Sequence, residues 1–408
     1  MRTFGFKYYD YIYTIICCLI FFLLDCSNLL GGDIDLQEAL TEVCNYRIEN
    51  GHAPNDEVFF KIISEKKSSL SPVEQNEVWR EIVRQQKSRF ELTDIINIFR
   101  AKTNSIRDYE SKFTVTKNGV SSNQKRIIHA LKGTNFFLEI DNYDKNRLEK
   151  RTLAYDGQLL YTVIDDHNSP FASIQNLGVS AISFENNNPL AQSMLYDTNQ
   201  TGMPHSGFDL LHFLSIFPNV VVLEKEEEFF GRRCLVIAGL SRRIYLDIES
   251  DLSVAKFQEF TVSSQNNPKG GRLLDGKRTL LSQRELFDLR DYTNGIWLPQ
   301  KSVYTFYDST GAVDSQTVIT YESIRLNHGL ADSYFNDIFP DGIPVADSIN
   351  GLIYNSSDRP SINGLLKDIT KSKRVIVLRY ISVCIGLMLI VIALVMKYRV
   401  YLANKNST

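Results

Sequence analysis

The sequence predicts an α+β protein built on one large antiparallel sheet. We expect a strongly curved sheet, or a half-open β-barrel of about ten or eleven strands, that wraps helices. N-terminal helices precede the sheet and a C-terminal transmembrane helix follows it. Three observations predict this class. Helical periodicity is confined to the region before Ser105 and to one insertion, two-residue alternation with hairpin turns fills the rest, and two uncharged apolar runs lie near the ends.

The two apolar runs predict export and a membrane anchor. Tyr11–Leu24 follows a basic N-terminus and has the length of a signal peptide, although an uncleaved signal anchor fits the same pattern. Cys26, just after this run, leaves lipidation open. The second run, within 375–397, approaches the roughly 20 residues that a spanning helix needs. We expect a single-pass membrane protein with its main domain on the extracytoplasmic side, extracellular or lumenal in a eukaryote and periplasmic in a bacterium.

Composition is that of a folded chain with an ordinary surface. Charged residues make up 23% and hydrophobic residues 43%, and the net charge of −3 provides no basic field for nucleic acid. The expected domains are a signal peptide or signal anchor at 1–30, a helical region at 31–105, the antiparallel half-barrel at 106–346, a stalk at 347–374, the transmembrane helix at 375–397 and a cytoplasmic tail at 398–408.

Two N-terminal segments carry strong helix signals. Ser71-Pro72-Val73-Glu74 combines an N-cap serine, a proline at the first helical position and a glutamate placed for a capping box. A further helix is expected at Glu91–Lys102, where apolar residues recur at positions i, i+3, i+4 and i+7. The apolar stripe of these helices predicts that they lie on a sheet.

After Asp108 the period changes to two residues, which predicts strands. Asn118-Gly119 and Asp156-Gly157 are hairpin signals, and 266–271 is a predicted loop. The predicted strands are Lys112–Thr116, Lys125–Leu131, Thr134–Asp141, Arg151–Tyr155, Leu159–Ile164, Val220–Glu224, Arg233–Ala238, Arg243–Asp247, Val254–Val262, Gln283–Tyr292, Trp297–Asp308 and Thr317–Leu326. One helix interrupts them, Phe208–Ile216. It is apolar on nearly all sides, which predicts burial against the sheet.

Motifs for catalysis or metal binding are not found in the sequence. No histidine pair has HExxH spacing, no CxxC occurs, and Asp165-Asp166-His167 fits a solvated turn better than a metal site. We therefore expect no enzyme, no catalytic residues, no cofactor and no metal. Cys44 and Cys234 are the cysteines of the body, and the sequence leaves open whether they form a disulfide or remain two thiols.

The order of several short motifs resembles the LolA/LolB-like lipoprotein carrier superfamily, in the larger relatives of that group. A helix ending near Ser105 runs into the strand IRDYESKFTVT, and Tyr155-Asp156-Gly157 precedes Leu160-Tyr161. Arg243–Asp247, Trp297-Leu298-Pro299 and the stretch Phe335–Asp347 continue the order. The resemblance covers about Glu91 to Asp347, and it implies a half-open antiparallel barrel around helices and an apolar cavity.

Two functions follow as hypotheses. The first is a membrane-tethered extracytoplasmic binding protein that holds a lipid, an acyl chain or a lipoprotein in an apolar cavity. The candidate lining residues are Phe136, Leu138, Ile140, Phe208, Leu211, Phe213, Tyr304 and Phe306. The alternative is a structural or sensory ectodomain with a packed barrel that binds a protein partner, since a packed core shows the same sequence pattern.

Overall fold

The computed structural model describes most of the body of the chain. The described residues are 34–66, 70–118, 124–144, 147–166, 170–175, 189–195, 210, 214, 220–266, 272–293, 295–336, 338–349 and 351–358. Within these ranges no helix is long and apolar enough to span a membrane. The predicted signal peptide 1–30, transmembrane helix 375–397 and tail 398–408 lie outside the described residues, as does most of the predicted stalk.

The chain forms two compact units that interleave along the sequence. The larger unit contains the residues up to Leu148 and Val179–Leu330, and the smaller contains Glu149–Gly178 and the residues from Ala331 onward. The domain boundaries expected from the sequence stay predictions. Each unit is described separately below.

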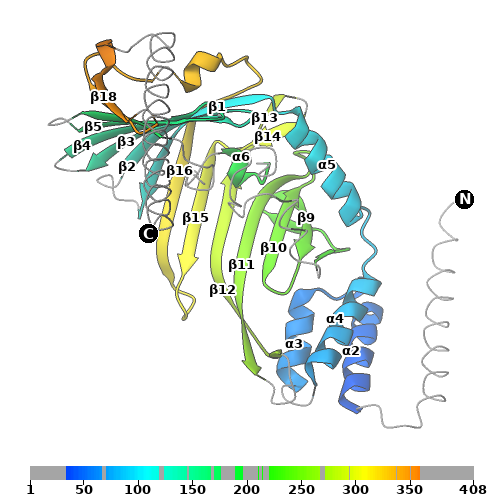
Figure 1. Cartoon of the computed structure of the whole chain (residues 1–408). Helices are drawn as coiled ribbons and strands as arrows, with labels where there is room; N and C mark the ends of the chain where they lie inside the picture. The colour runs from blue at the N-terminus through cyan, green and yellow to red at the C-terminus, as the bar shows by residue number, and fades with distance from the viewer. Residues whose placement is uncertain are drawn as a thin grey trace, which may run out of the picture. The chain divides into compact units, whose positions relative to one another are not determined.

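The larger unit combines helices with a long antiparallel sheet (Figure 1). Its helices are α2 (Ile34–Asn50), α3 (Asp56–Lys66), α4 (Pro72–Gln85), α5 (Leu92–Ser105) and the short α6 (Pro189–Gln192). Its strands are β1 (Asp108–Lys117), β2 (Gln124–Lys132), β3 (Asn135–Asp144), β7 (Val221–Val222), β8 (Glu227–Phe229), β9 (Arg232–Ala238), β10 (Arg242–Asp247), β11 (Ser253–Asn266), β12 (Arg272–Phe287), β13 (Arg290–Thr293), β14 (Ile296–Leu298), β15 (Lys301–Tyr307) and β16 (Val313–Leu326).

The strand order in this unit is β3-β2-β1-β16-β15-β12-β11-β10-β9-β7, with β8 paired to β9. β13 and β14 form a separate hairpin. All of these pairings are antiparallel. In Figure 1 the broad faces of β12 and β11 are visible, whereas β1 and β2 are seen nearly edge-on, so the sheet is strongly twisted across this unit.

The smaller unit is a short mixed sheet in the order β18-β17-β6-β5-β4. Its strands are β4 (Arg147–Tyr155), β5 (Leu160–Asp166), β6 (Phe171–Gln175), β17 (Pro344–Asp347) and β18 (Leu352–Asn355), and β17 runs parallel to β6. Short 3₁₀ helices, Asp332–Phe335 and Ser356–Asp358, precede and follow the last two strands.

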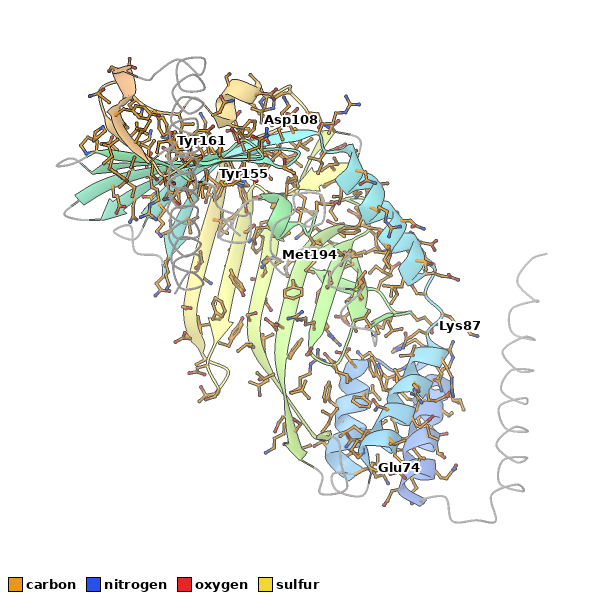
Figure 2. All side chains as sticks on the ribbon, in the orientation of Figure 1. Glu74, Lys87, Asp108, Tyr155, Tyr161 and Met194 are labelled. Carbon is orange, nitrogen blue, oxygen red and sulfur yellow. The ribbon has the colours of Figure 1, made fainter. Side chains whose placement is uncertain are left out.

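The predicted Asp156-Gly157 hairpin joins β4 to β5 and is confirmed. The Asp156 carboxylate accepts hydrogen bonds from the backbone N–H groups of Gln158 and Leu159. Two tyrosine hydroxyls stabilise the same turn. Tyr155 donates a hydrogen bond to the Gly157 carbonyl oxygen at 2.9 Å, and Tyr161 donates one to the Asp156 carboxylate at 2.8 Å. Figure 2 shows both tyrosines in this unit. The motif that contributed to the family resemblance is therefore a self-stabilised turn.

The predicted class is confirmed as a large, open antiparallel sheet with a few helices. The predicted strand number was wrong, because eighteen strands, β1–β18, are present among the described residues. Strands such as β6, β8 and β17 have too few residues to show a clear alternation. β12 also begins at Arg272, well before the predicted Gln283. Leu210 and Leu214 are the described residues of the predicted helix 208–216, and both are helical and buried.

The predicted start of α4 is confirmed in atomic detail. The Ser71 hydroxyl accepts a hydrogen bond from the Glu74 backbone N–H, and the Glu74 carboxylate accepts one from the Ser71 backbone N–H. This reciprocal pair satisfies donors that a helix end leaves open. It orients α4, on which Glu74 is labelled in Figure 2, so that Val78, Trp79 and Ile82 are buried.

α2, α3 and α4 pack together and cover one face of the sheet, where α3 and α4 contact β12. Phe59 and Trp79 make an edge-to-face ring contact at 5.3 Å in this core. Their cluster includes Val236 of β9 and Tyr245 of β10. We call this side of the sheet the helix face.

A buried ion pair holds α3 to the helix face. Asp56, at the start of α3, is fully buried, and its carboxylate accepts hydrogen bonds from Arg243 Nε and Nη2 at 2.9 and 2.6 Å. Arg278 of β12 contacts the same carboxylate. Burial by itself would raise the pKa of Asp56, but the bond from Arg243 and the two guanidinium charges outweigh burial and lower it. The carboxylate therefore remains charged in the core.

We predict that Asp56→Ala strongly destabilises the larger unit. It removes the buried anion that both Arg243 and Arg278 contact, which costs about 3 to 5 kcal/mol. Glu77→Ala is the matched control, because Glu77 pairs with Arg80 on the exposed side of α4 and such pairs contribute under about 1 kcal/mol. Urea unfolding of the full chain measures both. Equal midpoints for the two variants would show that the buried pair does not hold the helices.

A glycine allows α3 to approach β12 closely. Gly276 has φ +78°, and a Cβ placed there would overlap the backbone N and Cα of Ser64 in α3. We predict that Gly276→Ala costs about 3 kcal/mol or more, from a strained φ and a forced backbone shift. Gly311→Ala is the control, since Gly311 has φ +84° in open space and should cost only about 1 kcal/mol. Thermal unfolding compares them, and similar losses would contradict the close approach.

Candidate functional site

Strand register assigns a set of side chains to the side of the sheet opposite the helix face. Leu138 of β3 lies opposite His129 of β2, and His129 lies opposite Ser111 of β1. On the far side of β16, Tyr304 of β15 lies opposite Arg284 of β12. Directly opposed residues of antiparallel strands share a face, and alternate residues along a strand do too. We call the face that carries these five side chains the apolar face.

Five of the predicted lining residues lie on this face. Phe136, Leu138 and Ile140 alternate along β3, and Tyr304 and Phe306 alternate along β15, with ring centroids 4.4 Å apart. Phe136 and Leu138 are buried, and Ile140 and Tyr304 are half-buried, whereas Phe306 is 39% exposed. Phe208, Leu211 and Phe213 lie outside the described residues. That these side chains line a cavity stays a prediction.

Large apolar groups fill the centre of the face. Tyr109 and Phe113 of β1 and Ile127 of β2 are almost completely buried. The Phe113 and Tyr321 rings pack at 5.6 Å across the β1–β16 pairing. The face is therefore a continuous hydrophobic surface that runs over several strands, which is the kind of surface that an acyl chain or a covering segment of protein can bury.

His129 is a buried titratable group in the β1–β3 part of this surface. Its side chain is 1% exposed, and neither ring nitrogen has a hydrogen-bond partner among the described residues. Its ring packs edge-on against Tyr109 at 5.6 Å. Burial lowers the pKa of His129 to about 3, so the imidazole is neutral at physiological pH and carries one donor and one acceptor.

Hydroxyl groups on the same face are paired with one another. The Tyr109 hydroxyl and Ser111 Oγ are hydrogen-bonded to each other, and Ser111 lies directly opposite His129 on the neighbouring strand. Ser302 Oγ and the Tyr321 hydroxyl lie 3.4 Å apart between β15 and β16. These pairs satisfy buried polar atoms without changing the apolar character of the surface.

Arg284 places a positive charge on the face, and sequence reasoning missed it. It is 1% exposed and lies between two aromatic rings, with its guanidinium carbon 5.9 Å from the Phe257 centroid and 5.3 Å from the Tyr304 centroid. Burial lowers the pKa of Arg284 to about 10, which still leaves it charged at neutral pH. An arginine in a strand usually indicates a solvent-exposed position. The one sequence feature that could have indicated burial of Arg284 is the pair of aromatic residues that face it, Phe257 and Tyr304.

The structure also describes the two cysteines of the body and most of the Asp165-Asp166-His167 cluster. Cys44 and Cys234 are not joined in a disulfide, which decides the alternative left open, and burial raises the pKa of the Cys234 thiol to about 12. Asp165 and Asp166 end β5, and His167 lies outside the described residues. Among the described residues no group of three or more His, Cys, Asp or Glu is placed to hold a metal.

We predict that His129 makes the chain sensitive to acid. Its pKa is about 3 when folded and 6.5 when unfolded, so the unfolded chain binds the proton first, and stability is lost as the pH falls from 6.5 toward 3. Between pH 7 and about pH 4.5 the wild type should lose roughly 2 to 3 kcal/mol more than His129→Leu. Urea unfolding at the two pH values measures this difference, and parallel losses would show that His129 is solvated or paired.

Comparison with known proteins finds similar structures at low identity. No protein-family model and no curated sequence matches the chain. A DUF1329 family protein from Desulfovibrio piger covers 60% of this chain and 97% of its own, with a TM-score of 0.35 and 12% identity. A putative outer membrane lipoprotein-sorting protein domain from Vibrio parahaemolyticus covers 59% and 96%, with a TM-score of 0.33 and 10% identity.

A LolA superfamily protein from Nitrosomonas europaea covers 60% of this chain and 98% of its own, with a TM-score of 0.31 and 13% identity. Structures of the kind expected from the sequence resemblance are thus among those similar to this chain. Because the TM-scores are low, what this chain binds is argued from its own residues.

Proposed function

We propose that the larger unit is a binding module that holds a lipid or acyl chain against its apolar face. The observation that carries the proposal is His129, a neutral hydrogen-bonding group buried among apolar side chains of β1, β2 and β3 and without a partner among the described residues. A core that only needs to be packed gains nothing from such a group, because each unsatisfied buried polar atom costs about 1 to 3 kcal/mol. A binding surface gains specificity from it.

Exposure along β15 supports access to this face. Tyr304 is half-buried and Phe306 is 39% exposed, and their rings pack together where the face extends toward the end of the strand. An apolar ligand that enters here buries aromatic surface that water now contacts, at about 25 cal/mol for each Å² removed from water. In this proposal the half-open barrel expected from the sequence is the binding structure, and no covalent chemistry occurs on the ligand.

The proposed setting is extracytoplasmic and tethered. The apolar runs Tyr11–Leu24 and 375–397 are the basis for export and for a single anchor. A binding module at a membrane surface is placed to receive a lipid or a lipoprotein from it. Protease treatment of intact cells that carry the full chain tests this orientation: the body should be digested and a tag after Thr408 should be protected.

The alternative proposal is an ectodomain with a packed core that binds a protein partner. The near-complete burial of Tyr109, Phe113 and Phe136 favours it, because a filled face needs no ligand. The two proposals differ in a direct observable. A binding module co-purifies with lipid, whereas a packed ectodomain gives the mass of the chain alone and is captured by crosslinking to another protein in intact cells.

We predict that native mass spectrometry of the full-length chain, released from a detergent micelle, shows a bound mass of lipid size. Phe306→Glu should reduce its occupancy about tenfold or more, since a charge on the apolar face opposes burial of an acyl chain. Ile48→Glu is the matched control, because Ile48 lies 65% exposed on α2, at the helix face. The proposal is contradicted if the wild type carries no lipid, or if both variants lose it equally.

A further inference from the structure

The neighbours of His129 indicate which part of a ligand it would meet. Across the strands it faces Leu138 and Ser111, and along β2 its neighbours on the same face are Ile127 and Leu131. Ser111 Oγ is engaged with the Tyr109 hydroxyl. No described side chain is hydrogen-bonded to His129, and apart from this hydroxyl pair the surface around it is hydrocarbon or aromatic ring.

A neutral imidazole offers one N–H donor and one nitrogen acceptor. A matching ligand group must both accept and donate a hydrogen bond, must be uncharged to remain in apolar surroundings, and must be attached to an apolar body. A hydroxyl group on a long hydrocarbon meets all three conditions. An anionic headgroup does not, because moving a charge beside a neutral ring into an apolar surface is costly without a counter-ion.

We propose that His129 is the headgroup site of the module and that it selects neutral, hydroxyl-bearing lipids of the long-chain alcohol or acylglycerol class. This inference rests on the proposed function and adds the ligand class and its orientation. The hydroxyl lies at β2 between Ser111 and Leu138, and the hydrocarbon extends over the apolar face.

Replacing any side chains that cover His129 with the hydrocarbon of a ligand is energetically favourable. Any apolar side chains that cover His129 leave the face and the apolar body of the ligand replaces them, so buried hydrocarbon is exchanged for buried hydrocarbon. The hydroxyl then supplies hydrogen bonds that the imidazole otherwise lacks. One such bond contributes about 1.4 kcal/mol, which corresponds to tenfold in affinity.

Two photoactivatable long-chain alcohols test the assignment in membrane vesicles that contain the full-length chain. One carries its diazirine beside the hydroxyl and the other at the far end of the hydrocarbon. The first should label peptides of β1, β2 and β3 around His129, and the second should label other parts of the apolar face. Excess hexadecanol should compete with both probes, whereas excess hexadecyl sulfate should not.

Two substitutions sharpen the test. His129→Leu should lower labelling by the hydroxyl-end probe about tenfold, while the other probe still labels the face. His129→Gln retains a donor and an acceptor and should stay within about threefold of the wild type. His129→Leu also removes an unsatisfied buried group, so its thermal midpoint without ligand should be equal or higher, which excludes misfolding as the cause.

The outcomes separate the inference from the function on which it rests. Labelling of the face by both probes that is insensitive to His129→Leu, or hydroxyl-end labelling away from β2, would overturn the headgroup assignment and leave lipid binding intact. Competition by hexadecyl sulfate as strong as by hexadecanol would overturn the selectivity for neutral groups. No labelling of the apolar face by either probe would overturn the proposed function and the assignment together.

Discussion

The pairing of β1 with β16 is the interaction on which the larger unit depends. It joins β1, and with it β2 and β3, to β16, whose residues lie 200 to 217 positions after their partners in β1. The register of this pairing places Phe113 opposite Tyr321 and Val115 opposite Ile319, all on the apolar face. Since a shift of one residue would move every side chain of β1 to the other side, this register decides whether His129 and Tyr304 share a surface.

Buried polar groups have different surroundings on the two faces of the sheet. On the helix face, the Asp56 carboxylate pairs with both Arg243 and Arg278, and these charges hold α3 in one position, while two nitrogens of Arg278 have no hydrogen-bond partner in the described part of the chain. On the apolar face, His129 has a polar ring without a partner among the described residues. A satisfied network specifies a packed arrangement, whereas an unsatisfied group is a stability cost that a protein retains where it serves a function. The apolar face is the candidate site because the His129 ring has neither a hydrogen-bond partner nor an ion partner among the described residues, whereas Arg278 keeps its ion pair with Asp56.

Sequence reasoning predicted the parts whose signals are local. The capping box at Ser71 and Glu74 and the Asp156-Gly157 turn follow from the residues that form them, and both are confirmed. The alternation of Phe136, Leu138 and Ile140 placed them correctly on one face of a strand. Short strands such as β17 were missed because their pairing with β6 is a tertiary contact with no local pattern.

The site itself could be predicted only in part. Aromatic residues on β15 and β3 indicated an apolar lining, but nothing in the sequence shows that the two strands contribute to one face, since this follows from registers across four strand pairs. Arg284 and His129 read as ordinary strand residues, and their burial comes from neighbours distant in the chain. The roles of Phe208, Leu211 and Phe213 in this lining stay predictions.

An experimental structure of the full-length chain, purified from the membranes in which it is expressed, would show directly whether the apolar face holds a ligand. We predict density for an elongated molecule along the apolar face, with a polar atom within hydrogen-bond distance of a His129 ring nitrogen. A face filled throughout by side chains of the chain itself, with His129 bonded to one of them, would contradict this prediction and favour a packed ectodomain.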